Sequence, residues 1–355
     1  MSNSTKSFLR LFLISTIFWV GAFILFTAIR YNGLESELSL FTDDVLDLPL
    51  RAYFEGAIIV GLIVSLFYAI IEFLFDRFSK RLVLGLSIIL KSIIYFILII
   101  VVLSLTSFYL EELTDLDLPN EIGWWRKDPF FWITVIYFVI ASIVFSLIRI
   151  ANGRFGRGNF LQVLVGQYKK PKEQENVLMF LDLKDSTKIA EQLGHKMYSQ
   201  FIQDCFLDLN ITLNRFEAEV YQYVGDEAVI YWRGKSGFRN NNCINMFFAF
   251  QKRLEKRRSY FEKKYNFWPV FKAGVHFGKL MVAEIGTVKK DLAFHGDVIN
   301  TASRIQSLCN KFNKSLLLSE SVMENLNISP SHFQLLAQDM ELKGKSERLK
   351  IYAIQ

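Results

Sequence analysis

The sequence predicts two structural parts, an α-helical domain of four membrane-spanning helices over residues 1–150 and an α+β domain of the ferredoxin-like type over residues 176–355. Two observations support this prediction. Four long apolar runs lie in the first 150 residues, and from Asn176 onward short β-rich segments alternate with long amphipathic ones. Residues 151–175 begin with the glycine-rich segment Ala151–Gly158 and continue into a charged stretch, which is typical of a linker.

Each apolar run is close to the ~20 residues that a helix needs to cross ~30 Å of hydrocarbon. The first run follows two basic residues, as in a signal peptide, but no small-residue cleavage site follows it and three more runs come after it. We therefore expect four retained spans, which are Leu11–Ile29, Ala57–Phe75, Leu84–Leu105 and Phe130–Ile148.

The segments that flank these runs differ in charge. Lysine and arginine dominate the N-terminus, the loop between the second and third runs and the segment after the fourth, whereas the other two loops are acidic. Because cytosolic loops carry the basic excess, we expect a multi-pass protein of the inner or plasma membrane with both termini in the cytosol. This topology explains much of the formal net charge of +6 without a nucleic-acid partner. The three cysteines form no CxxC pair, and we expect free thiols.

One charged residue lies inside the third apolar run. Lys91 is about two turns from its start, and Glu72 lies near the cytosolic end of the second run. Either the two residues form an ion pair within the bilayer, or the Lys91 side chain extends to the nearby cytosolic surface. We favour the second interpretation. The runs otherwise lack the rows of polar residues expected of a transport path, so we interpret them as an anchor, a dimerisation element or a sensor.

The second part contains strands that alternate with two long helices. This order favours an α+β sandwich in which helices pack on one face of an antiparallel sheet. The expected elements are a strand over Asn176–Leu183, a helix over Thr187–Phe216 with a break near Gly194, a hairpin of Ala218–Val224 and Glu227–Trp232, a helix over Asn240–Tyr265, a strand pair of Val270–Gly278 and Lys279–Gly286, a helix over Asp297–Phe312, a strand over Ser315–Ser319, and a hairpin within Met340–Ile354.

Two aspartates are the first candidates for chemistry. Asp182 ends the first strand of this part, and Asp226 lies in the turn of the following hairpin. In a βαββ arrangement these strands are neighbours, so the two carboxylates are expected at one end of the sheet. Mg²⁺ takes such oxygen ligands together with substrate phosphates, and a pair of ions can activate a hydroxyl and stabilise a leaving phosphate. Taken alone, each aspartate is more simply a turn residue or a helix cap.

Two further polar patterns lie downstream. Asn300 and Arg304 are four residues apart on a predicted helix and therefore share one face. An amide beside a guanidinium suits a sugar oxygen and a phosphate, although an exposed polar face explains the pair equally simply. Lys343 and Lys345 flank Gly344, where they suit either a polyphosphate or a solvated turn.

The order of these patterns resembles that of a known family. FLDLKDST, YQYVGDEAVIYW, GVHFGKLMVAEIG, HGDVINTASR and ELKGK occur in the sequence and spacing of class III adenylyl and guanylyl cyclase catalytic domains, over roughly Asn176 to Ile354. The resemblance implies a homodimer through this domain, with active sites at the interface. It also implies conversion of a nucleoside triphosphate to its cyclic monophosphate and pyrophosphate, for which we favour ATP and cyclic AMP. With its four expected transmembrane helices, the chain resembles bacterial membrane-bound members of the family.

The resemblance implies a role for each candidate residue. Asp182 and Asp226 would hold two Mg²⁺ or Mn²⁺ ions per active site, with the carbonyl of Leu183 as a further ligand. The partner chain would supply Asn300 to orient the ribose and Arg304 to stabilise charge on the α-phosphate. Main-chain groups of Asp185, Ser186 and Thr187 would bind the substrate phosphates, and the partner chain would supply Lys343 to the β- and γ-phosphates. We also expect Lys345 to contact the substrate, because of its place beside Gly344 rather than because of the resemblance.

The sequence departs from the family pattern at the base pocket. Gln222 stands where many adenylyl cyclases have lysine, and Ala293 stands where they have aspartate or threonine. A glutamine amide both donates and accepts hydrogen bonds, so it suits either purine. The base choice therefore stays open between ATP, which we favour, and GTP. Asp185 and Ser186 also replace a common Gly-Phe pair.

Two other functions compete with this interpretation. YQYVGDEAVI resembles the GGDEF pattern of diguanylate cyclases, but Val224 replaces a glycine there and HGDVINTASR has no place in that family. A catalytically inactive, nucleotide-sensing membrane protein is the second alternative. It would be indicated by loss of a metal aspartate, the asparagine or the arginine, and all four residues are present.

Overall fold

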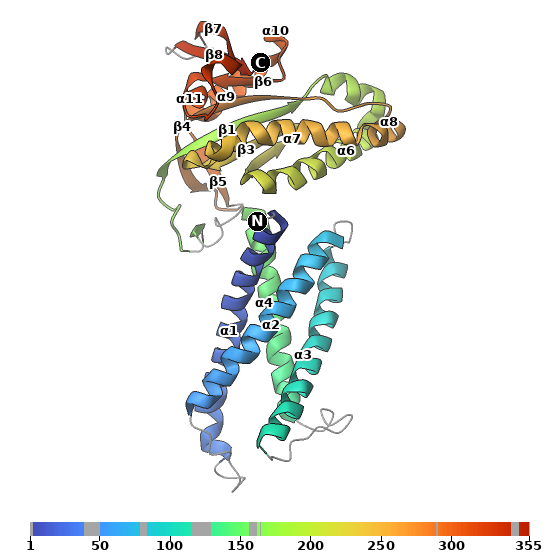
Figure 1. Ribbon diagram of the computed structural model, residues 1–355, viewed down its shortest axis with the longest axis vertical. Coiled ribbons are helices and arrows are strands. Elements are labelled where there is room, and N and C mark those ends of the chain that lie inside the picture. Colours follow the sequence, from blue (N-terminus) through green and yellow to red (C-terminus); the bar gives the residue numbers. More distant parts are fainter. Residues whose placement is uncertain are drawn as a thin grey trace. The chain divides into compact units, whose positions relative to one another are not determined.

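The computed structural model describes residues 3–38, 50–78, 84–114, 129–155, 162–163, 165–288, 290–341 and 348–354. The chain forms two compact units, Met1–Ala151 and Asn152–Gln355, which are described separately below (Figure 1).

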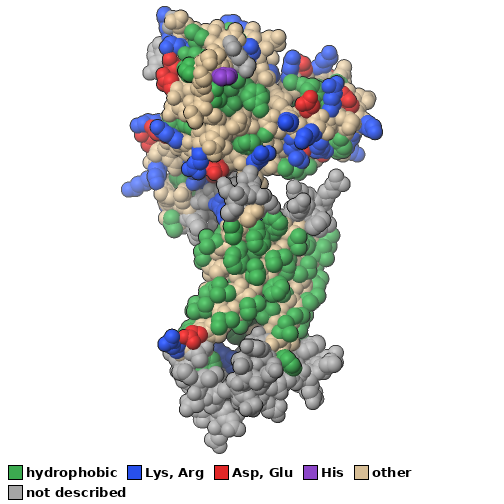
Figure 2. Space-filling model, viewed as in Figure 1, with side chains coloured by type: hydrophobic (Ala, Val, Ile, Leu, Met, Phe, Trp, Pro, Cys, Tyr) green, Lys and Arg blue, Asp and Glu red, His purple; other side chains and the backbone are tan. Residues whose placement is uncertain are grey.

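The first unit consists of long apolar helices. These are α1 (Asn3–Leu38), α2 (Leu50–Phe78), α3 (Leu84–Thr114) and α4 (Pro129–Phe155). Apolar side chains cover much of the surface that the described helices of this unit show in Figure 2. Within the described residues, three helices are long and apolar enough to cross a membrane, over Phe8–Arg30, Tyr53–Phe75 and Phe131–Ala151. The described apolar stretch of α3, Ile89–Val102, is shorter. Among the described residues, three of the four expected spans are therefore long enough.

The interior of the first unit is aromatic. The ring of Trp19 in α1 lies 4.4 Å from that of Tyr68 in α2, and Tyr68 stacks on Tyr95 of α3 at 3.7 Å. Phe145 of α4 meets Tyr68 edge-on at 5.3 Å. Side chains from all four helices therefore share one core, which packs by ring contacts.

A buried carboxylate lies beside this aromatic core. Glu72 is 1% exposed, and its Oε2 accepts a hydrogen bond from Nζ of Lys91 at 2.7 Å. Tyr95 donates to Oε1, and the Arg149 guanidinium lies 3.5 Å from Oε2. Since a buried carboxylate requires counter-charge and donors, Lys91 turns inward to Glu72. The expectation that Lys91 extends to the membrane surface is therefore wrong.

The second unit is built on one mixed sheet with the order β2-β3-β1-β4-β6-β8-β7, and β5 pairs with β4 outside this path. Its described neighbours run antiparallel except β4 and β6, which are parallel. The strands are β1 (Lys172–Leu183), β2 (Glu219–Val224), β3 (Glu227–Arg233), β4 (Phe271–Ile285), β5 (Asp291–His295), β6 (Leu316–Ser319), β7 (Phe333–Glu341) and β8 (Arg348–Ile354).

Helices cover both faces of this sheet. On one face, α6 (Ser186–Leu213), α7 (Asn242–Lys256) and α8 (Arg258–Tyr265) bury the main apolar core. The other face carries α9 (Asp297–Ser307), whose Val298 and Ala302 pack on Leu178 and Phe180 of β1. The short helices α10 (Cys309–Phe312) and α11 (Glu320–Met323) follow. The sequence-based expectation of a purely antiparallel sheet with helices on one face is thus corrected.

Two glycines in β4 allow α9 to approach the sheet closely. A Cβ atom at Gly274 would overlap the backbone of Gln306, and one at Gly278 would lie 2.8 Å from Cγ2 of Val298. Any larger residue at Gly274 would push α9 away from the sheet, because the obstacle is backbone rather than a movable side chain.

Several element boundaries differ from those expected. The break at Gly194 inside α6 is confirmed by its left-handed φ of 66°. The predicted helix over Asn240–Tyr265 divides at Arg257, and the one over Asp297–Phe312 divides at Leu308. The predicted strand pair is a single strand, β4, because Gly278 pairs with Asn176 of the long β1 instead of turning the chain. The three cysteines are free, as expected, and buried.

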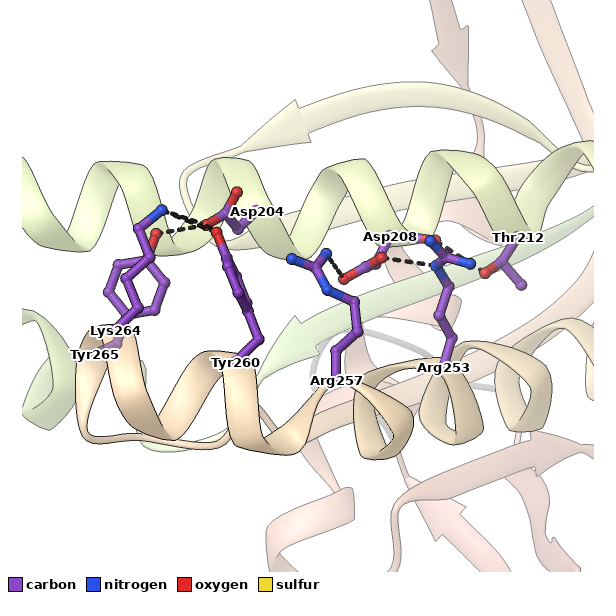
Figure 3. Close-up of polar contacts among 8 residues, drawn as sticks. All are labelled: Asp204, Asp208, Thr212, Arg253, Arg257, Tyr260, Lys264 and Tyr265. Atoms are coloured by element: carbon purple, nitrogen blue, oxygen red, sulfur yellow. Dashed lines mark hydrogen bonds and ion pairs between the residues drawn. The ribbon is translucent and has the colours of Figure 1, made fainter. Parts of the chain in front are cut away.

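An ion-pair network joins α6 to α7 and α8 (Figure 3). The carboxylate of Asp208 is fully buried and accepts hydrogen bonds from Arg253 at 2.7 Å and from Arg257. Two guanidinium groups compensate for the loss of water around this charge. The pairing therefore holds α6 beside α7 and beside the junction between α7 and α8.

Candidate active site

Asp182 lies near the end of β1 with one carboxylate oxygen already engaged. Its Oδ2 accepts a hydrogen bond from Nε2 of Gln306 at 2.9 Å and lies 3.6 Å from Nζ of Lys272. In the ladder, Asp182 stands opposite Glu227 of β3 on one side and Lys272 of β4 on the other. These residues share the face on which α9 packs, because directly opposed residues of antiparallel strands point the same way.

Asp226 occupies the tight turn between β2 and β3. Val224 pairs with Glu227 across this turn, and Gly225 has a φ of 60°, which favours glycine. Burial raises the pKa of Asp182, and the negative charge of Asp226 raises it further, whereas Lys272 and Gln306 oppose the increase. The structure therefore brings the two predicted metal ligands close enough to repel each other.

The carboxylates fit a divalent cation. Burial, Asp182 and Asp226 together raise the pKa of Glu227 as well, so the site concentrates negative charge that a cation would neutralise. Among the described residues, no group of three or more His, Cys, Asp and Glu side chains forms a metal cluster. Asp182 and Asp226 could supply side-chain ligands to such a cation, because carboxylate oxygens are the ligands that Mg²⁺ prefers.

The first turn of α6 begins beside Asp182. Asp185 has a left-handed backbone with φ of 57°, which aspartate tolerates better than most residues. This conformation explains how Asp185 replaces the glycine common in the resembling family. Ser186 then starts the helix and Thr187 is exposed. The free backbone N–H groups of such a turn are suited to phosphate oxygens.

Tyr198 of α6 faces the same end of the sheet. Burial raises the pKa of Tyr198 to about 12, and the charge of Asp226 contributes, whereas a hydrogen bond with Ser186 has the opposite effect. Tyr198 therefore lies within electrostatic range of Asp226 and beside Ser186, the first residue of α6.

Gln222 shares the face of Asp182. It stands opposite Val229, whose side chain belongs to the cluster under α9, and its own side chain is exposed. Ala293 lies on β5 and is buried. The two predicted base-pocket positions therefore come from different hairpins.

Asn300 and Arg304 occupy the outer side of α9. Asn300 is exposed and Arg304 is partly exposed, whereas the opposite side of the helix buries Val298, Ala302 and Ile305 against the sheet. The structure does not bring Asn300 or Arg304 to the aspartates of the same chain by any hydrogen bond or ion pair among the described residues. Lys343 and Lys345 lie outside the described residues.

Three neighbours of Asp182 were missed from the sequence. Lys272 is a lysine inside the otherwise apolar strand segment VFKAGV, which was a usable signal. Glu227 directly follows the predicted metal ligand Asp226. Gln306 gives no signal, because its contact with Asp182 spans 124 residues of sequence.

The fold and this site define a nucleotidyl cyclase type of catalytic domain, and comparison with known proteins gives the family. Residues 168–355 match the adenylate and guanylate cyclase catalytic domain, so the chain belongs to that family. The match removes the diguanylate cyclase alternative.

Relatives and a solved structure are similar to this chain. "Adenylate cyclase 2" of Rhizobium meliloti (strain 1021) is 31% identical over 202 residues, which cover 56% of this chain and 55% of that protein. "Adenylate cyclase" of Anabaena cylindrica is 24% identical over 181 residues, which cover 50% of this chain and 36% of that protein. The chain thus spans about half or less of these relatives' length. A bacterial light-regulated adenylyl cyclase shares the fold, with a TM-score of 0.53 and 17% identity, covering 62% of this chain and 64% of that chain.

Proposed function

We propose that this protein is a membrane-anchored adenylate cyclase that converts ATP to cyclic AMP and pyrophosphate at the interface of a homodimer. One observation supports this proposal above the others. Asp182 and Asp226 lie at one end of the sheet, while the exposed Asn300 and the partly exposed Arg304 lie on the outer side of α9. A single chain therefore presents two halves of a site that a second copy would complete.

Asp182, Asp226 and the carbonyl of Leu183 would hold two Mg²⁺ or Mn²⁺ ions. Such ions, when bound, favour ionisation of the attacking 3′-hydroxyl and stabilise negative charge on the departing pyrophosphate. The first turn of α6, from Asp185 to Thr187, would bind phosphate oxygens through backbone N–H groups.

The partner chain contributes the other half. An isologous interface places the same surface of each chain opposite its counterpart, so each α9 would face the carboxylates of the other chain. Arg304 would then stabilise charge on the α-phosphate as the bond to the leaving group lengthens, and Asn300 would orient the ribose. Lys343 and Lys345 would neutralise the outer phosphates.

The choice of ATP rests on the relatives. Both named relatives are adenylate cyclases, and their names favour adenine. Guanylate cyclase activity is the second candidate, because the exposed side-chain amide of Gln222 can donate a hydrogen bond to one purine and accept one from the other.

The first unit would anchor the enzyme in the bilayer. Three helices have the length and composition of spans. We infer that α3 is the fourth, because it is 31 residues long and its Lys91 forms an ion pair with Glu72 of α2, which is one of those three helices. An even number of spans leaves both termini on one side, and the basic loops favour the cytosol.

A product assay tests this function. The full-length chain in detergent, with Mn²⁺ and either ATP or GTP, is expected to release cyclic AMP from ATP. Cyclic GMP alone would keep the mechanism and replace the substrate. No cyclic product from either nucleotide, in a protein shown to be folded and dimeric, would leave the inactive sensor as the better description. Asp226→Asn is the control, because it removes a charge of the metal pair without shortening the side chain.

A further inference from the structure

The edge strand β2 contains a bulge at Tyr221. Val220 pairs with Ile230 and Gln222 pairs with the next residue of β3, Val229, so Tyr221 is the extra residue between two ladder positions. A bulge of this kind places two consecutive side chains toward one face. Tyr221 packs in the cluster that faces α9, and Gln222 stands opposite Val229 of that same cluster.

The Tyr221 side chain reaches strand β5. The backbone N–H of Phe294 donates a hydrogen bond to the Tyr221 hydroxyl at 3.1 Å, and the two rings stack at 4.1 Å with 12° between their planes. Among the described strands, β5 pairs only with β4. The Tyr221 hydroxyl thus accepts from a backbone N–H that would otherwise lie at a free sheet edge.

This contact joins the two segments that carry the base-pocket positions. Gln222 directly follows Tyr221, whereas Ala293 and His295 flank Phe294. The hydrogen bond and the ring stack therefore set the spacing between the Gln222 segment and the Ala293 segment. Without the bulge, Tyr221 and Gln222 would point to opposite faces, and this connection would be lost.

We propose that Tyr221 is a positioning residue for purine selection, which acts by holding β2 and β5 at a fixed separation. This inference rests on the proposed function, because it assigns a role within that nucleotide site. Tyr221 itself need not touch the base. Its ring fills the space between the strands, and its hydroxyl fixes their relative position along the strand axis.

Tyr221→Phe in the full-length chain separates these contributions, since it keeps the ring stack and removes the acceptor for Phe294. We expect KM for the preferred nucleotide to rise roughly five-fold, in line with one lost hydrogen bond. The ratio of kcat/KM between ATP and GTP should move toward one by a similar factor, because both purine-facing segments become less ordered. The kcat at saturating nucleotide should stay within about two-fold, since the metal ligands and α9 are untouched.

Tyr231→Phe is the matched control. Tyr231 meets the same Phe294 ring edge-on at 5.1 Å, but its hydroxyl donates to Glu219 rather than to β5. This variant should keep the wild-type KM and the wild-type ATP to GTP ratio. Equal changes in both variants would mean general loosening of the cluster and would overturn the proposal.

Two further outcomes remain distinguishable. A wild-type chain that forms no cyclic nucleotide contradicts the proposed function itself. An active wild type whose Tyr221→Phe variant keeps both KM and the purine ratio contradicts only the role of Tyr221. Binding of fluorescent adenine and guanine nucleotides to the full-length protein gives a readout independent of turnover, and the variant should lose discrimination there as well.

Discussion

Gln306 donates a hydrogen bond from its side-chain amide to Oδ2 of Asp182 at 2.9 Å, and this bond connects α9 to the carboxylate end of β1. The same helix displays Asn300 and Arg304 on its outer side. Gly274 makes the contact feasible, because its missing side chain lets the α9 backbone approach β4 at Gln306. One helix thereby orients a proposed metal ligand of its own chain and presents the groups proposed to act on the partner's substrate.

Gln306→Ala should weaken the metal response of the enzyme. Loss of a partner that orients a metal ligand typically reduces metal affinity about 10–100-fold, so the Mn²⁺ concentration for half-maximal activity should rise by at least about ten-fold. Activity at saturating Mn²⁺ should recover most of the wild-type rate. Ser307→Ala is the control, since among the described residues its hydroxyl donates a hydrogen bond to the Arg304 carbonyl and has no bond to Asp182. An unchanged Mn²⁺ dependence would show that Asp182 needs no support from α9.

Asp182→Asn should abolish activity and yet stabilise the metal-free fold. Burial and the charge of Asp226 raise the folded-state pKa of Asp182, so its stabilising contribution belongs to the protonated form, present below the unfolded pKa of ~3.9. That contribution is lost as pH rises through the folded pKa, which leaves the ionised group unfavourable at pH 7. Without metal, the variant should unfold about 2–4 °C higher at pH 7. A lower unfolding temperature would show that Lys272 and Gln306 outweigh the repulsion.

Mixing two inactive variants tests the shared site. Asp182→Ala removes a proposed metal ligand, and Asn300→Ala removes the proposed ribose contact, so neither homodimer should form product. In mixed dimers, one of the two sites combines an intact Asp182 with an intact Asn300. Co-expression with two affinity tags should restore up to about half of the wild-type activity in the doubly purified species. Absence of activity in verified mixed dimers would place all catalytic groups within one chain.

The sequence predicts well those parts of the site that lie on local patterns. Asp182 and Asp226 follow from strand ends and a turn, and the Gly194 break follows from a single glycine. The contact of Gln306 with Asp182 and that of Tyr221 with Phe294 depend on tertiary pairing over 124 and 73 residues, which leaves no periodic signal. The predicted strand pair has its boundary at Gly278, because glycine often marks a turn. In the structure β4 continues through Gly278, whose missing side chain makes room for Val298 of α9.

Asp204 should make the second unit sensitive to acid. Burial alone would raise the pKa of this carboxyl, but hydrogen bonds from Lys264, Tyr265 and Tyr260 lower it overall. Its stabilising contribution is therefore present above the unfolded pKa of ~3.9 and is lost as pH falls through the folded pKa. Asp204→Asn should lower the unfolding temperature by about 2–4 °C at pH 7 and have little effect near pH 3.

A matched control lies on the adjacent helix turn. Glu262→Gln breaks an exposed ion pair with Arg258, which contributes little to stability, so its unfolding temperature should match the wild type at both pH values. A loss for Asp204→Asn that is equal at pH 7 and pH 3 would mean that packing, rather than charge, carries the contribution of Asp204.

Glu72 should contribute more to the stability of the first unit than Lys91. The buried carboxylate accepts from Lys91 and Tyr95 and lies beside Arg149, so it connects α2 to both α3 and α4. Glu72→Ala leaves two cations and a hydroxyl without this partner, which by analogy with broken buried pairs costs about 3 kcal/mol. Lys91→Ala leaves Glu72 with Tyr95 and Arg149 and should cost clearly less. Unfolding of the detergent-solubilised chain by increasing SDS measures both losses. An equal loss would show that the Lys91 pair alone accounts for the stabilisation and that Glu72 does not join three helices.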